Sequence, residues 1–135
     1  MKIVIIDGQG GRLGRMLVEA AIERFPDARI TAVGTNTIAT AAMIKGGARQ
    51  AATGENAVRV ACRNADAIIG PMGIVIADAL YGEITPEMAV AVGQSPATRI
   101  LLPMSTHCEN VVAGVREGLS IQELVDDAMN RLAAL

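Results

Sequence analysis

The chain has 135 residues, 51% of them hydrophobic, and a formal net charge of −2 at pH 7. This length suits one domain with a substantial core, and the absence of a basic run excludes a protein that binds the nucleic-acid backbone. One phenylalanine, one tyrosine and no tryptophan also exclude a module that stacks bases on aromatic side chains. No signal segment or membrane-spanning run of about 20 apolar residues is present, so we expect a cytoplasmic protein.

The first half of the chain alternates between strand and helix patterns. Residues 3–6 form an apolar run typical of a strand buried on both faces, and a helical pattern of buried positions follows Gly14. Residues 29–33 predict a second strand, and a short helix through Ala41 ends at Gly46. Residues 49–52 predict a weak third strand, after which Thr53 is expected to cap a third helix.

The second half repeats the alternation. Residues 67–70 predict a fourth strand, and the apolar residues 73–80 favour a helix. Thr85 followed by Pro86 marks a helix start, and strands are expected at residues 99–102 and 111–115. Ser120 and Glu123 form the pattern of a capping box at the start of a final amphipathic helix.

Six strands that alternate with helices predict an α/β fold, a doubly wound parallel sheet with helices on both faces in a single domain over residues 1–135. Such sheets bind ligands beyond the carboxyl ends of their strands, at the switch point between strands one and four. In this sequence that edge carries residues 7–12 and the group Gly70, Pro71 and Met72. We therefore expect these segments to contact a ligand.

The stretch IVIIDGQGGRLG runs from the first strand into a glycine-rich turn. Gly8, Gly10, Gly11 and Gly14 nearly match the dinucleotide fingerprint, but the last glycine stands one residue too late. Glycines at these places allow a tight turn and let backbone N–H groups approach a pyrophosphate. The alternative is a turn between a strand and a helix that binds no ligand. The ending Leu13-Gly14-Arg15 excludes a P-loop, which requires Gly-Lys-Ser/Thr.

The segment GQGGRLGR resembles the cofactor loop of dihydrodipicolinate reductases over about fifteen residues. The resemblance implies that Gly8, Gly10, Gly11 and Arg12 bind a pyrophosphate, with Gln9 and Leu13 beside them. The chain has a single histidine, so the paired histidines of that family's catalytic motif are missing. The resemblance therefore implies a ligand and not a reaction.

A second resemblance spans nearly the whole chain. The blocks IDGQGG, AVGTNTIAT, ATGENA, IIGPMGIVIADAL, GEITPEMAVAVGQS and ILLP resemble a family of short bacterial proteins of unknown function with a Rossmann-like character. Membership of that family implies the fold. It implies no catalytic residue, ligand or activity.

Asp7 stands at the mouth of the glycine loop, where a bare carboxylate near a pyrophosphate would cost affinity. In a structural role, Asp7 would accept N–H groups of the loop or helix, or pair with Arg12. In a functional role, it would hold a metal, a ribose hydroxyl or a substrate amine. The sequence favours the structural role because acids are common at helix starts.

Sites that prefer NAD carry an acid at the end of strand two, about 20 residues beyond the glycine loop. Thr35 and Asn36 occupy that place, and no acid accompanies them. Small donors suit a 2′-phosphate better than a ribose diol, so we expect NADP to bind in preference to NAD. The alternative is that Asn36 or Thr37 only caps the following helix.

Other candidate residues give weaker signals. Glu55 suits the positive end of a helix dipole better than a catalytic role, and Cys62 lies in an apolar stripe. His107 and Cys108 stand in a polar loop after strand five, and neither cysteine has a partner at a metal-ligand or redox spacing. We therefore expect no metal site, and the catalytic residues stay unknown.

The sequence as a whole predicts a small protein that binds a nucleotide, NADP or NAD foremost, at the glycine loop. One alternative is an oxidoreductase for a small substrate whose site is completed across a dimer interface. Another is an interaction module without a ligand. The apolar residues 73–80 and the helix after Pro86 also predict a homodimer, because one sheet face cannot cover them all.

Overall fold

The computed structural model describes residues 1–104 and 110–135, which form five strands, five α-helices and one 3₁₀ turn. The strands are β1 (Lys2–Asp7), β2 (Arg29–Gly34), β3 (Gln50–Thr53), β4 (Ala67–Pro71) and β5 (Thr98–Leu102). The helices are α1 (Arg12–Arg24), α2 (Thr37–Lys45), α3 (Glu55–Cys62), α4 (Pro86–Gln94) and α5 (Ile121–Ala133). The 3₁₀ turn η1 (Met72–Val75) follows β4 directly.

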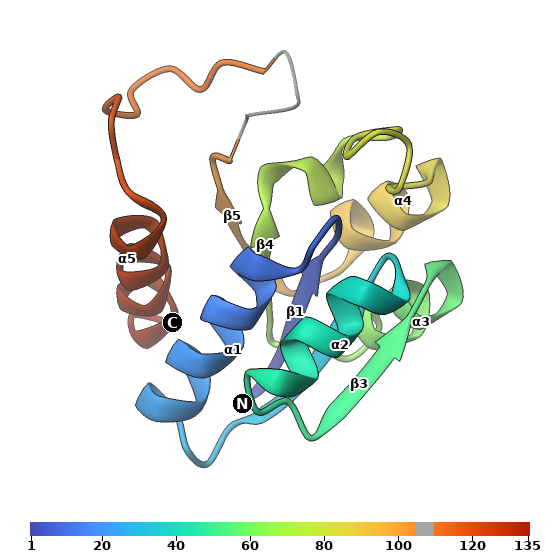
Figure 1. Ribbon diagram of the computed structural model, residues 1–135, viewed down its shortest axis with the longest axis horizontal. Coiled ribbons are helices and arrows are strands. Elements are labelled where there is room, and N and C mark those ends of the chain that lie inside the picture. The colour runs from blue at the N-terminus through green and yellow to red at the C-terminus, as the bar shows by residue number, and fades with distance from the viewer. Residues whose placement is uncertain (105–109) are drawn as a thin grey trace.

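The strands form one parallel sheet in the order β3-β2-β1-β4-β5. The chain crosses from β3 to β4 on the far side of β1, so β1 lies between β2 and β4 (Figure 1). Ile5 pairs with Ala32 on one side and with Ile69 on the other. The predicted doubly wound sheet and its switch point between β1 and β4 are therefore confirmed.

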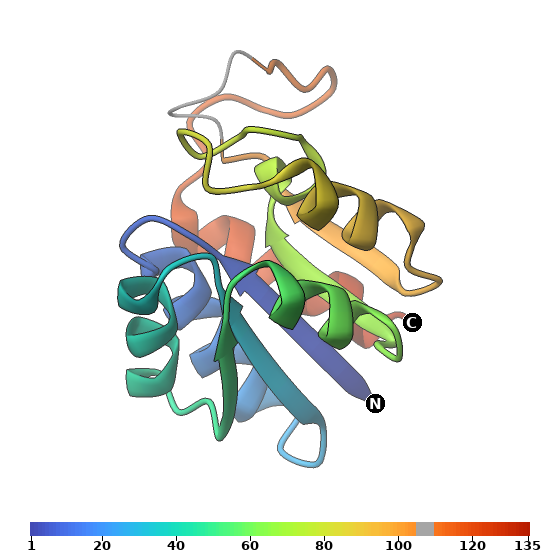
Figure 2. The ribbon, with the colours of Figure 1, turned by 90° about the vertical axis from the view of Figure 1, so that its right-hand side faces the viewer.

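Successive residues of β1 point to opposite faces of the sheet, and each face has its own apolar cluster. Ile3 and Ile5 pack in the cluster that includes residues of α1, α2 and α5. Val4 and Ile6 pack in the cluster that includes residues of α3, η1 and α4. Helices therefore cover both faces, as expected, and Figure 2 shows the sheet between the two layers.

Three predicted helix starts carry side-chain caps. The Asn36 side chain accepts a hydrogen bond from the N–H of Ala39 at 2.8 Å. The hydroxyl of Thr85 accepts one from the N–H of Met88 at 3.2 Å. Ser120 accepts the N–H of Glu123 at 3.1 Å. The cap expected from Thr53 is wrong: Gly54 precedes α3, and the hydroxyl of Thr53 pairs with that of Thr40 at 2.7 Å.

The expected sixth strand at residues 111–115 is wrong. These residues form coil and a turn, and Gly114 in their midst has φ +84°. A left-handed residue interrupts the extended backbone that a strand needs. The sheet among the described residues therefore ends at β5.

The helix expected at residues 73–80 is also wrong. Only η1 forms, and Asp78, Leu80 and Tyr81 have φ between 56° and 65°. The three consecutive β-branched residues after Gly73 disfavour a helix, and the N–H of Asp78 instead bonds the carbonyl of Ile84 at 2.7 Å. Residues 76–85 therefore form a looped strap between η1 and α4.

Gly14 brings α1 close to the sheet. A Cβ at this position would lie 2.7 Å from the Cβ of Asp7 and 2.7 Å from the sulfur of Met43. Both neighbours are held by buried structure, since Asp7 and Met43 are 6% and 0% exposed.

Gly14→Ala is expected to lower the free energy of unfolding by about 1–3 kcal/mol, because the added methyl overpacks this contact. Gly93→Ala in α4 is the matched control, since a Cβ there meets no atom within 4 Å. The control should raise stability by up to about 1 kcal/mol through helix propensity. Urea denaturation measures both, and equal stability of the two variants would contradict the close packing at Gly14.

Candidate functional site

The carboxylate of Asp7 ties the end of β1 to the first turn of α1. It is 6% exposed, and it accepts the N–H of Gly8 at 2.8 Å and that of Gly14 at 2.7 Å. The structural role considered for Asp7 in the sequence analysis is thus present in its hydrogen bonds. Arg12 is exposed, and among the described residues no ion pair joins it to Asp7.

Burial raises the pKa of Asp7 from 3.8 to about 6. The hydrogen bonds from Gly14 and Gly8 act in the opposite direction and lower this pKa, while the nearby carboxylate of Glu83 raises it further. Two acids therefore share the mouth of the loop, and Asp7 is the one that titrates near neutrality.

The four glycines of the loop have different surroundings. A Cβ at Gly8 would lie 2.6 Å from the Thr35 hydroxyl, and one at Gly11 would lie 2.7 Å from the Cα of Ala39. Gly11 also has φ +75°, a conformation that side chains disfavour. Gly10 alone of the four is open, because a Cβ there meets nothing within 4 Å.

Several N–H groups of the loop already have acceptors inside the protein. Gly8 and Gly14 bond Asp7, Gly11 bonds the carbonyl of Gly8 at 3.0 Å, and Gln9 bonds Glu83 at 3.0 Å. Within residues 1–104 and 110–135, no acceptor is found for the N–H groups of Gly10, Arg12 and Leu13. These groups surround the N-terminus of α1, which carries the positive end of the helix dipole.

Glu83 is the functional candidate that the sequence analysis missed. Its carboxylate accepts the hydroxyl of Thr35 at 2.6 Å, the side-chain amide of Asn36 at 2.7 Å and both the backbone and the side-chain N–H of Gln9. Burial alone would raise the pKa of Glu83, but these hydrogen bonds outweigh it and hold the pKa below its ordinary value of 4.5. Glu83 therefore stays ionised at neutral pH.

No local pattern singles out Glu83, because it stands in a short turn just before the α4 cap. Its partner Gln9 is 74 residues away in the chain. The one available signal was the absence of an acid at the end of β2. The structure supplies that acid from the strap between η1 and α4.

A hollow of about 350 Å³ lies beside the glycine loop. Among the residues predicted for the site, those that line it are Asp7, Gly8, Gln9, Gly10, Gly11, Arg12, Leu13 and Pro71. Thr35, Asn36, Gly70 and Met72 do not line it: Thr35 and Asn36 bind Glu83, and Gly70 packs against the backbone of Ile6. The hollow also contacts residues outside the prediction, among them Leu80 and Ile121.

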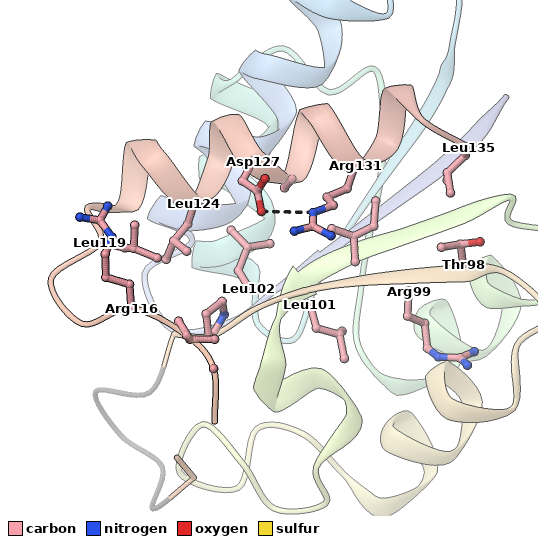
Figure 3. Close-up of a pocket in the computed structure, with 15 residues that line it drawn as sticks. Thr98, Arg99, Leu101, Leu102, Arg116, Leu119, Leu124, Asp127, Arg131 and Leu135 are labelled. Atoms are coloured by element: carbon pink, nitrogen blue, oxygen red, sulfur yellow. Dashed lines mark hydrogen bonds and ion pairs between the residues drawn. The ribbon is translucent and has the colours of Figure 1, made fainter. Parts of the chain in front are cut away.

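A larger hollow of about 560 Å³ lies between β5 and α5 (Figure 3). Asp127 and Arg131 of α5 form an ion pair at 3.3 Å across one wall, and Leu101, Leu102 and Leu124 supply apolar surface. Its lining contains no glycine-rich turn, since Gly114 is the single glycine among the residues that line it. The site considered below is therefore the smaller hollow at the switch point.

The other side chains that the sequence analysis considered lie apart from this hollow or outside the described residues. Cys62 is 2% exposed in the core, where burial raises its pKa to about 11, and Glu55 accepts the Thr85 hydroxyl at 2.6 Å. His107 and Cys108 lie outside the described residues. In the described part of the chain, no three acidic, histidine or cysteine side chains gather as metal ligands, and no helix is long and apolar enough to cross a membrane.

The raised pKa of Asp7 makes stability depend on pH. Between pH 3.8 and about 6 the folded protein holds a proton that the unfolded chain releases, so stability falls as pH rises through this window. Relative to Asp7→Asn, the wild type should lose about 2 kcal/mol of unfolding free energy between pH 4.5 and pH 7.5. Urea denaturation at both values measures the difference, and parallel pH profiles would show that Asp7 titrates normally.

Comparison with known proteins identifies the family and gives weak structural likenesses, among them the following two. A nucleoside-diphosphate-sugar epimerase from Pseudomonas aeruginosa is 14% identical, with a TM-score of 0.48 over 98% of this chain and 47% of that one. This chain thus spans about half the length of the epimerase. A dodecameric FMN-dependent UbiX-like decarboxylase from Escherichia coli O157:H7 is 16% identical, with a TM-score of 0.44 over 99% and 92% of the two chains.

No curated protein sequence matches this chain. The family model described as "Domain of unknown function (DUF3842)" matches residues 2–135. That match agrees with the resemblance seen in the sequence blocks, and the fold is Rossmann-like, as they imply. The chain therefore belongs to the family described as domain of unknown function DUF3842.

Proposed function

We propose that this protein binds a small phosphate-bearing ligand of the nucleotide class at the start of α1. The observation that supports this proposal is the set of N–H groups of Gly10, Arg12 and Leu13, for which the described residues supply no acceptor. All three residues line the hollow at the switch point. Open N–H groups at a helix N-terminus favour the binding of a phosphate.

The walls of the hollow suit the rest of such a ligand. Leu13, Pro71, Leu80 and Ile121 offer apolar surface beside the polar loop, and the exposed Arg12 adds a positive charge. Its volume of about 350 Å³ is at the small end of ligand sites. The size favours a mononucleotide or one half of a dinucleotide over a whole dinucleotide enclosed in the hollow.

The expected preference for NADP over NAD loses its argument in this geometry. That argument rested on free donors at Thr35 and Asn36 without an acid nearby. Both donors bind the ionised carboxylate of Glu83, which would repel a 2′-phosphate. We therefore propose nucleotide binding in general and expect no advantage for NADP in the wild-type protein.

The alternative functions differ in what they require. An oxidoreductase for a small substrate would need a further catalytic group beside the hollow, supplied by a second copy. Asp7 titrates near neutrality but is buried and holds two N–H groups. A ligand-free interaction module would leave the N–H groups of Gly10, Arg12 and Leu13 to water, so ligand screening separates it from the leading proposal.

Gly10→Val should weaken nucleotide binding at least tenfold without lowering stability, because the side chain enters open space at the phosphate position. Gly11→Val is an unsuitable test of the loop, because its side chain would collide with α2. Thermal-shift screening followed by calorimetry with AMP, ADP, FMN, NAD and NADP measures the effect.

Gly93→Val is the matched control, since a Cβ at Gly93 also meets nothing within 4 Å and Gly93 lies away from the hollow. It should bind as the wild type does. Equal affinity of Gly10→Val and Gly93→Val would show that the ligand binds elsewhere, and no shift with any nucleotide would refute the proposal.

A homodimer through α4 is a separate expectation. Much of the apolar surface of the strap and α4 is covered within the chain, because Ala79 and Ile84 of the strap and Met88, Ala89 and Val92 of α4 are buried in one apolar cluster. Val90 remains 52% exposed, whereas Met88 is 4% exposed. An interface on this helix would therefore use Val90.

Val90→Arg is expected to convert such a dimer to a folded monomer, because the charge would be buried at the interface. Met88→Arg should instead unfold the chain and cannot report on assembly. Light scattering at micromolar concentration measures the mass. A monomeric wild type, or a dimer that survives Val90→Arg, would contradict an interface through α4.

A further inference from the structure

Glu83 binds a group of donors that come from two different elements. The backbone N–H of Gln9 belongs to the glycine loop, and the Thr35 hydroxyl and Asn36 amide follow the end of β2. All three bond the same oxygen, Oε1, at 2.6–3.0 Å. Three N–H and O–H groups that converge on one oxygen form an anion-binding arrangement, and the anion here is part of the chain.

The carboxylate has little capacity left for a ligand. A carboxylate offers about four lone-pair positions. Oε1 uses three hydrogen bonds, and Oε2 accepts the side-chain amide of Gln9. Glu83 is therefore placed to fill this site rather than to bind the hydroxyl groups of a ribose.

The strap that carries Glu83 is held in an unusual backbone conformation. Asp78, Leu80 and Tyr81 all have positive φ, as does Gln9 on the opposite side of the contact. The Gln9 side chain also donates to the carbonyl of Leu80 at 3.3 Å. Both the strap and the glycine loop lie beyond the ends of the strands in Figure 2, where a ligand of this fold would pass from β1 to β2.

We propose that Glu83 is a specificity-determining residue that occupies, from within the chain, a second phosphate subsite made by Gln9, Thr35 and Asn36. Its carboxylate stops a ligand at the glycine loop from extending a phosphate over β2. The part of this inference that concerns nucleotides rests on the proposed function. The existence of the masked subsite, meaning the group of donors that Glu83 occupies, does not rest on the proposed function, because inorganic phosphate alone can test it.

Removal of the Glu83 side chain should uncover the three donors. In Glu83→Ala, inorganic phosphate should raise the melting temperature by at least about 3 °C more than in the wild type. The ratio of NADP to NAD affinity should rise at least tenfold above its wild-type value. Glu83→Gln should resemble the wild type, since the amide still fills the subsite.

Glu87→Gln is the matched control, because Glu87 is an exposed acid in the first turn of α4. It should leave both measurements unchanged. Glu83→Ser, whose hydroxyl is too short to reach Gln9, provides a second way to empty the subsite. If neither Glu83→Ala nor Glu83→Ser folds, Glu83 serves only the fold and the proposal fails.

Amide NMR of the wild type adds a test that needs no variant. A nucleotide should shift the signals of Gly10, Arg12 and Leu13 and leave the side-chain amide of Asn36 unmoved. A shift at Asn36, or a wild-type preference for NADP of tenfold or more, would show that ligands displace Glu83 and would overturn the proposal.

The two proposals can fail separately. If phosphate stabilises Glu83→Ala but no nucleotide binds either protein, the proposed function fails and the masked subsite stands. If nucleotides bind but emptying the subsite changes neither the phosphate response nor the NADP to NAD ratio, Glu83 has no role in specificity.

Discussion

The Asp7 carboxylate is the interaction on which the geometry of the switch point depends. With two hydrogen bonds of 2.7–2.8 Å it joins the last residue of the central strand to the first turn of α1. Gly14 can then lie against Asp7 and Met43, which sets the distance between helix and sheet. The cost is a buried carboxylate whose pKa is raised to about 6. Because this pKa is about 6, the charge of Asp7 beside the glycine loop differs between pH 5 and pH 8.

Glu83 is the second carboxylate that accepts hydrogen bonds from the glycine loop, and it does so from the strap before α4. Between them, Asp7 and Glu83 accept three of the N–H groups that a glycine-rich loop offers, and the turn itself satisfies that of Gly11. The N–H groups without an acceptor among the described residues are those of Gly10, Arg12 and Leu13. The loop thus combines a glycine pattern close to the dinucleotide fingerprint with a hollow of about 350 Å³ beside it, and Glu83 reaches the loop from a strap that is distant in the sequence.

Much of the fold could be predicted from the sequence. Apolar strands, the caps at Asn36, Thr85 and Ser120 and the repeated strand-helix order define a doubly wound sheet because these signals are local. The expectations of a helix at residues 73–80 and of a strand at residues 111–115 were wrong because both rested on apolar content. Apolar content marks such segments as candidates for burial, but it does not state their backbone conformation. Most of residues 73–80 pack in the same apolar cluster as α4 without forming an α-helix, and residues 111–115 lie exposed without forming a strand.

For the candidate site, the sequence by itself determined the glycine loop, the acid at its mouth and the edge of the sheet where they meet. Each of these follows from residues adjacent in the chain or from the rule that parallel strands carry ligands at their carboxyl ends. Only the tertiary structure decided which loop glycine is open, which N–H groups have no acceptor in the described part of the chain, and that Glu83 lies against Thr35 and Asn36. The physical reason is that hydrogen bonds and steric contacts depend on distances of a few ångströms between residues up to 74 positions apart. Periodicity and spacing along the chain do not contain those distances.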